Sequence, residues 1–166
     1  MKNTIIVASV AVAVVGLLLW TYTRVPRSTQ SAAISTGSTQ AALGDPIPQY
    51  DFGSISMLKG NVEHEFAITN TTGADLKITR AETSCMCTKA VLRLPDGNEL
   101  GPFSMPGHGF NPSVNVVVRP DEIFVVRAIF DPAAHGPAGI GNIERAVILS
   151  TDNGYITVPF KAYVTP

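Results

Sequence analysis

The sequence predicts an all-β protein: an immunoglobulin-like β-sandwich of about seven strands, preceded by one N-terminal transmembrane helix and a disordered tether. Three observations support this fold class. The N-terminus holds a long apolar run without charge, a small polar segment follows it, and apolar residues then recur at every second position. These patterns divide the chain into a signal anchor over residues 1–24, a flexible tether over residues 25–47 and a sandwich domain over residues 48–166.

The predicted anchor is the run of twenty uncharged residues at positions 4–23. As a helix it would be about 30 Å long, which matches the hydrocarbon core of a bilayer. Trp20 and Tyr22 lie near its end, where aromatic rings favour the membrane interface. Lys2 precedes the run, so we expect a single-pass protein with a cytoplasmic N-terminus and an extracytoplasmic C-terminal domain.

A cleaved signal peptide is the alternative, and it would release the domain as a secreted protein. Cleavage requires small residues soon after a short apolar centre. In this chain Trp20, Tyr22, Arg24 and Pro26 occupy that region. The sequence therefore favours an uncleaved anchor and leaves the cleaved form open.

The tether and the charge distribution exclude one class of partner. Residues 28–44 are small, polar and nearly uncharged, which is typical of a flexible linker. Three basic residues flank the membrane run, so the rest of the chain holds nine Lys and Arg against thirteen Asp and Glu. No basic patch or basic helix results, and we expect no nucleic-acid partner.

Strands are predicted wherever apolar and polar residues alternate, because alternate side chains of a strand face opposite sides of the sheet. Asn70–Gly73 and Asp152–Gly154 provide polar turns between them. No segment after the anchor has convincing helical spacing. The predicted strands lie at residues 50–55, 62–69, 76–78, 114–118, 124–130, 146–148 and 156–164.

Several of these segments resemble a known family. The matching motifs are, in chain order, Tyr50–Ile55, His64–Asn70, Ser84–Thr88, Phe130–Pro132 and Ser150–Asn153. Together they resemble the bacterial proteins that carry domain of unknown function 1573, over residues 48–165. The resemblance implies an exported immunoglobulin-like sandwich, related to the ASH and major-sperm-protein types, with no established activity. Met86 departs from the usual Gly between the cysteines, and residues 95–112 are an apparent insertion.

Cys85 and Cys87 are the only cysteines of the chain. In a strand, two residues at this spacing would lie about 7 Å apart at Cα, whereas a disulfide prefers about 5.5–6 Å. Three interpretations stay open. The cysteines are buried thiols, a local disulfide of an oxidising compartment, or a pair of thiolates on a soft metal.

Soft ligands for such a metal lie nearby in the sequence. Met105 and His108 are in the Gly- and Pro-rich insertion, and thiolate, thioether and imidazole groups together suit Cu(I). Cys85, Cys87, Met105 and His108 are therefore the candidate copper ligands; otherwise we expect no cofactor. His135 and His64 are expected to be hydrogen-bonded in a loop and on a strand, respectively.

The function expected from these patterns is binding. The sequence contains no Gly-rich phosphate loop and no nucleophile elbow, so we expect no enzymatic activity. We expect a membrane-anchored extracytoplasmic module that binds a protein partner or has a structural role in the cell envelope. The alternative is a soft-metal or thiol-redox protein that uses the two cysteines with the Met and His residues of the insertion.

Overall fold

The computed structural model describes residues 38–109 and 111–166, which form an all-β structure with two short 3-10 helices, Met57–Lys59 and Gly136–Gly139. The ten strands are β1 (Ser38–Ala42), β2 (Tyr50–Ser56), β3 (Val62–Thr69), β4 (Leu76–Thr83), β5 (Thr88–Arg93), β6 (Glu99–Phe103), β7 (Val116–Val118), β8 (Ile123–Phe130), β9 (Gly141–Thr151) and β10 (Gly154–Thr165).

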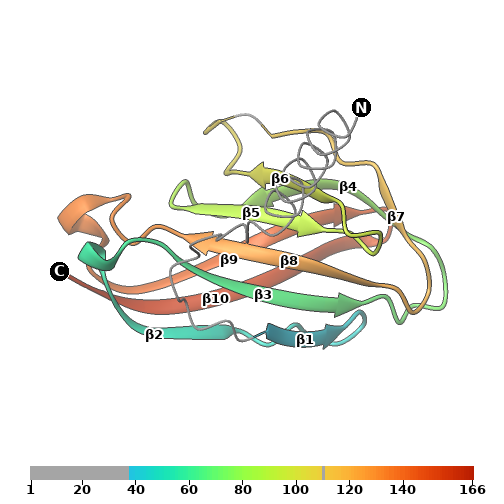
Figure 1. The fold of residues 1–166 in the computed structure, drawn as a ribbon, viewed down its shortest axis with the longest axis horizontal. Coiled ribbons are helices and arrows are strands. Elements are labelled where there is room, and N and C mark those ends of the chain that lie inside the picture. The colour runs from blue at the N-terminus through green and yellow to red at the C-terminus, as the bar shows by residue number, and fades with distance from the viewer. Residues whose placement is uncertain (1–37, 110) are drawn as a thin grey trace, which may run out of the picture. The chain divides into compact units, whose positions relative to one another are not determined.

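The strands form two five-stranded sheets (Figure 1). The first sheet has the order β1-β3-β8-β5-β6, and the second has the order β2-β10-β9-β4-β7. Both sheets are mixed. β1 runs parallel to β3 and β2 runs parallel to β10, while the remaining neighbours are antiparallel. The chain therefore changes sheets between its first two strands.

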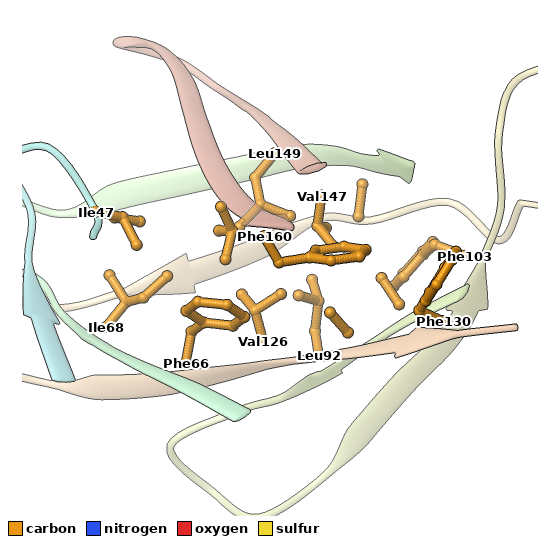
Figure 2. Close-up of a cluster of buried hydrophobic side chains, with 14 of the residues drawn as sticks. Ile47, Phe66, Ile68, Leu92, Phe103, Val126, Phe130, Val147, Leu149 and Phe160 are labelled. Carbon is orange, nitrogen blue, oxygen red and sulfur yellow. The ribbon is translucent and has the colours of Figure 1, made fainter. Parts of the chain in front are cut away.

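The core lies between the two sheets. In β8 the buried residues alternate with more exposed ones, and the buried set is Phe124, Val126, Ala128 and Phe130. Phe66 of the first sheet and Phe160 of the second are both fully buried. Figure 2 shows Phe66, Val126 and Leu92 meeting Phe160, Val147 and Leu149 across the interior. The alternation thus gives each sheet one apolar face, and the two faces cover each other.

The all-β prediction is confirmed, but the structure has ten strands where the sequence predicts about seven. β1 lies inside the segment expected as tether, residues 25–47, so ordered structure begins before the predicted domain boundary. β6 lies inside the apparent insertion, and β5 follows the cysteines. These three strands account for the difference.

The predicted anchor cannot be compared with the structure. Residues 4–23 lie outside the described residues, and so does the tether up to residue 37. Within residues 38–109 and 111–166, no helix has the length and apolar character needed to cross a membrane.

Candidate functional site

The two cysteines lie in a tight turn between β4 and β5. The Thr88 N–H donates to the carbonyl oxygen of Cys85 over 3.1 Å, which closes the turn. The turn brings the Cα atoms of Cys85 and Cys87 to 5.3 Å, and the two sulfurs form a disulfide. The strand geometry assumed for the C-x-C segment is therefore wrong, because the chain bends at Cys85 and shortens the Cα separation into the range that a disulfide requires.

Buried hydrogen bonds hold this turn in addition to the disulfide. The hydroxyl oxygen of Thr83, which is almost fully buried, lies 3.0 Å from the Cys85 carbonyl oxygen and 3.1 Å from that of Thr88. From the end of β8, the Asp131 N–H donates to the Cys87 carbonyl oxygen over 2.9 Å. The turn is thus tied to the loop that follows β8.

That loop carries His135 to the disulfide. Its Nε2 atom lies 3.2 Å from Cys85 Sγ. Within the loop, the Asp131 carboxylate accepts a hydrogen bond from the Ala133 N–H over 2.9 Å, and the Ala133 carbonyl accepts one from the Gly136 N–H over 2.9 Å. A Cβ atom at Gly139 would lie only 3.2 Å from His135 Cβ, so the absence of a side chain there leaves room for the histidine.

The two sulfurs have different surroundings. Cys85 is 8% exposed and its sulfur also accepts a hydrogen bond from the Cys87 N–H over 3.4 Å. Cys87 is 2% exposed, and its sulfur lies 3.8 Å from the Thr88 hydroxyl oxygen. His135 is exposed. One sulfur therefore lies beside a solvent-accessible imidazole, and the other faces the interior.

The predicted copper ligands are only partly brought together. In the described part of the chain, the His, Cys and acidic side chains whose ligating atoms lie within 4.8 Å of one another are Cys85, Cys87 and His135. His108 is not in this group. It is exposed, and its backbone N–H donates to the Met105 carbonyl oxygen over 3.0 Å in a turn of the insertion. The histidine beside the cysteines is His135, which is not among the four candidate copper ligands.

His135 could be located only from strand pairing. It follows Cys85 by 50 residues in the sequence. β5 pairs with β8 so that Thr88 lies opposite Phe130. The residues just before Thr88 and those just after Phe130 therefore leave the sheet at the same place, which is where the disulfide and the histidine meet.

The buried His64 lies in a separate aromatic cluster. Its ring is stacked on Tyr50, with 3.4 Å between ring centroids and 7° between the planes, and its Nε2 lies 2.8 Å from the Thr39 hydroxyl oxygen. Burial lowers the pKa of His64, partly opposed by the neighbouring Glu65 charge. The expected hydrogen-bonded histidine is found at Nε2, whereas the buried Nδ1 has no partner among the described residues.

The family resemblance is supported directly. Residues 47–94 match the model of a family described as "Protein of unknown function (DUF1573)". The matched segment begins just before β2, ends just after β5 and includes the Cys85–Cys87 turn. The comparison with curated proteins found no match.

Two solved structures are distantly similar in fold. A family 123 glycoside hydrolase from Clostridium perfringens aligns with a TM-score of 0.44 and 8% identity, over 70% of this chain and 23% of that one. The periplasmic chaperone SfaE aligns with a TM-score of 0.31 and 10% identity, over 81% of this chain and 57% of that one. This chain therefore spans less than two thirds of either protein, and similarity at this level carries no functional argument.

Proposed function

We propose that this chain is a membrane-tethered, immunoglobulin-like module that acts outside the cytoplasm, without catalysis, by binding another protein of the cell envelope. Two packed mixed sheets with alternating buried residues support the immunoglobulin-like class. The predicted span at residues 4–23 supports membrane attachment. The Cys85–Cys87 disulfide is the observation that best supports a location outside the cytoplasm, because disulfides form and persist in oxidising compartments.

The location can be tested with one accessible cysteine. Leu58 is 89% exposed, so a Leu58→Cys substitution in a Cys85→Ser, Cys87→Ser chain presents a single surface thiol. In bacterial spheroplasts, a maleimide that cannot cross the membrane should label this thiol before lysis. Labelling only after lysis would contradict the proposed location.

A matched buried cysteine gives the control. Ala128 is fully buried, so Ala128→Cys in the same background should react only after denaturation. The fraction that holds the labelled Leu58→Cys chain separates the two leader hypotheses. An uncleaved anchor keeps the chain in the membrane fraction, and a cleaved leader releases it at a lower mass.

The free edge of β7 is the place that we propose for a protein partner. The two sheets have four edge strands, β1, β6, β2 and β7. The register of β2 and of β6 with their neighbours is interrupted by bulges, which protect edges from pairing. β1 consists of small and polar residues, which offer a partner little apolar surface. β7 consists of three valines and, among the described strands, pairs only with β4. Val117 is 50% exposed and lines a groove with Leu94 and Pro95. An extended segment of another protein could pair with this edge by β-augmentation.

A photo-crosslinking amino acid at Val117 tests this edge in cells. We expect an adduct with a second protein when the probe replaces Val117. The control position is Tyr163 of β10, which is 48% exposed and pairs with Asn142 of β9 on one side and Ser54 of β2 on the other. Adducts of equal yield at both positions, or none at Val117, would reject β7 as the partner's docking edge.

Soft-metal binding is a second candidate function, favoured by the convergence of Cys85, Cys87 and His135 within 4.8 Å. Two thiolates and an imidazole suit Cu(I), but only after the disulfide has been reduced. Competition between the reduced full-length protein and a Cu(I) chelator measures this binding. One equivalent of copper that is lost in His135→Ala and kept in His108→Ala would support it; no binding by the reduced protein would reject it.

A further inference from the structure

The Cys85–Cys87 disulfide contributes less to the fold than most disulfides do. A disulfide stabilises a protein mainly by restricting the unfolded chain, and the effect grows with the length of the closed loop. Here the two cysteines are separated by two positions in the sequence. Thr83 and Asp131 hold the same turn by hydrogen bonds to backbone carbonyls, so the turn does not depend on the sulfur bond.

The surroundings of Cys85 favour its thiolate. In the disulfide form, His135 Nε2 lies 3.2 Å and the Cys87 backbone nitrogen 3.4 Å from Cys85 Sγ. The tautomer of His135 that carries its proton on Nε2 can therefore donate to this sulfur together with the Cys87 N–H. Hydrogen bonds from these two groups would stabilise the Cys85 sulfur when it leaves a mixed disulfide. Cys87 has only the Thr88 hydroxyl at 3.8 Å and is the more buried of the two.

We propose that the Cys85–Cys87 pair undergoes thiol–disulfide exchange with the dithiol of another protein, and that Cys85 is the cysteine that forms the mixed disulfide. This activity is stoichiometric and goes beyond the binding role. Exchange depends on which sulfur is accessible and on which thiolate is stabilised, and both criteria select Cys85.

Each step of the exchange forms one S–S bond and breaks another. A thiolate of the incoming dithiol attacks Cys85 Sγ, so a new S–S bond forms while the Cys85–Cys87 bond breaks. Cys87 leaves as a thiolate beside the Thr88 hydroxyl and takes up a proton. The second thiolate of the dithiol then attacks its own partner sulfur, and Cys85 leaves as a thiolate held by His135 and the Cys87 N–H.

Two electrons therefore pass to the cysteine pair, and the dithiol becomes a disulfide. The dithiol loses two protons, of which Cys87 takes one. The second proton either binds to Cys85 or, if Cys85 stays a thiolate, passes to the solvent. The reverse sequence oxidises the dithiol pair of this chain and reduces the partner's disulfide, with Cys85 again in the mixed disulfide.

The first test traps the mixed disulfide in the unaltered protein. Full-length oxidised protein in detergent micelles is incubated with glutathione, quenched with acid, alkylated with N-ethylmaleimide and analysed by tandem mass spectrometry. We expect glutathione on Cys85 and N-ethylmaleimide on Cys87, with Cys85 favoured about tenfold or more because of its accessibility. Glutathione mainly on Cys87, on both equally, or on neither would overturn the proposal.

The second test isolates His135. In a Cys87→Ser background, the rate at which iodoacetamide alkylates Cys85 is measured from pH 5 to pH 9 in His135→Ala, His135→Gln and His108→Ala. We expect His135→Ala to lower the rate at pH 6 about tenfold and to move the rate profile to higher pH, because the thiolate loses its donor. His135→Gln, which keeps an N–H donor, should recover part of the rate.

His108→Ala is the matched control, because this exposed histidine is not in the cysteine group. Its rate profile should coincide with that of the parent. Far-UV circular dichroism verifies that each variant is folded. Coincident profiles for His135→Ala and His108→Ala would reject the role of His135, and the trapping experiment decides the role of Cys85 in the unaltered chain.

Discussion

Arg93 reaches across a neighbouring strand to Glu65. Its two terminal nitrogens, Nη1 and Nη2, lie 3.0 Å and 2.8 Å from the two carboxylate oxygens of Glu65. Arg93 is in β5 and Glu65 is in β3, and β8 lies between these two strands in the sheet. This ion pair therefore links β5 to β3 across β8 on the outer face of the first sheet, and its hydrogen bonds raise the pKa of Arg93.

Glu65→Ala tests how much this ion pair contributes to the free energy of unfolding. Both side chains retain solvent contact, so we expect a loss of about 0.5–1 kcal/mol in the free energy of unfolding, the range of well-formed surface pairs. Urea denaturation of the two single variants and the double variant with Arg93→Ala measures the coupling. Glu82→Ala is the control, because its pair with Arg80 is longer, at 3.8 Å, and Arg80 is highly exposed. A coupling energy near zero for Glu65 and Arg93 would contradict this expectation.

Asn70 is expected to be the most costly polar side chain to remove. It is fully buried, and its amide donates to the carbonyl oxygens of Ala74 and Val118 over 2.9 Å and 2.8 Å. Asn70→Ala leaves the buried Val118 carbonyl without this donor, so the free energy of unfolding should fall by about 1–3 kcal/mol. Asn142→Ala, at an exposed asparagine, should change stability by less than about 0.5 kcal/mol. Equal effects of the two substitutions would refute this role.

Phe160 tests the packing of the two sheets. It is fully buried and contacts Phe52 and Phe130 with ring centroids 5.6 Å and 5.9 Å apart. Phe160→Ala removes this contact and leaves a cavity, which should lower the free energy of unfolding by about 3–5 kcal/mol. Leu58→Ala, at an 89% exposed position, should have an effect within about 0.5 kcal/mol. Thermal or urea unfolding measures both, and a loss below 1 kcal/mol at Phe160 would contradict the packing.

His64 should make stability depend on pH. Burial lowers its pKa in the folded state below the value of about 6.5 expected when unfolded. Between these two values the unfolded chain binds more protons than the folded one. The contribution of neutral His64 to the free energy of unfolding is therefore fully present above pH 6.5. It is lost as the pH falls from 6.5 to the folded pKa, by at most about 1.4 kcal/mol per pH unit.

Denaturation curves at pH 7.5, 6 and 5 measure this effect. His64→Phe keeps an aromatic ring against Tyr50 and removes the titrating group, so its stability should fall less over this range than that of the parent. His108→Ala, at an exposed histidine, should follow the parent. If the parent and His64→Phe lose stability in parallel, His64 is not the responsible group.

The Cys85→Ser, Cys87→Ser chain should remain folded. The loop that the disulfide closes is short, so the chain-entropy estimate of its contribution is about 1.5 kcal/mol, roughly half of that for a fifteen-residue loop. Urea denaturation of the oxidised parent and of the double variant measures the difference. A loss of 4 kcal/mol or failure to fold would show that the bond is mainly structural, contrary to the view that the turn is held by Thr83 and Asp131.

The sequence predicts those strands whose inward residues differ clearly from their outward ones. β3 is such a strand, because Phe66 and Ile68 face inward, whereas Glu65 and Thr69 face outward. β5 is not predicted, because Thr88 and Ala90 face inward while Val91 is partly exposed, so the alternation is weak. β1 is also missed. It pairs with β3 through its backbone, and its small residues resemble those of a linker.

The candidate site is predicted only in part. The cysteine pair stands out in the sequence, but its turn geometry does not, because the bend depends on the hydrogen bonds from Thr83 and Thr88. Met105 and His108 are favoured by their proximity in the sequence, whereas the structure supplies His135 through the pairing of β5 with β8. The contact between Cys85 and His135 spans fifty positions and arises from the strand topology, so no local pattern in the sequence indicates it.

The redox state of Cys85 and Cys87 in living cells shows on which side of the membrane the domain folds. Cells that express the full chain are quenched with acid, and free thiols are then labelled with a maleimide that adds mass. We expect no mass shift for the full chain, because the disulfide forms outside the cytoplasm. A chain that lacks residues 1–24 stays in the cytoplasm and should gain two labels. Two free thiols in the full chain would contradict it.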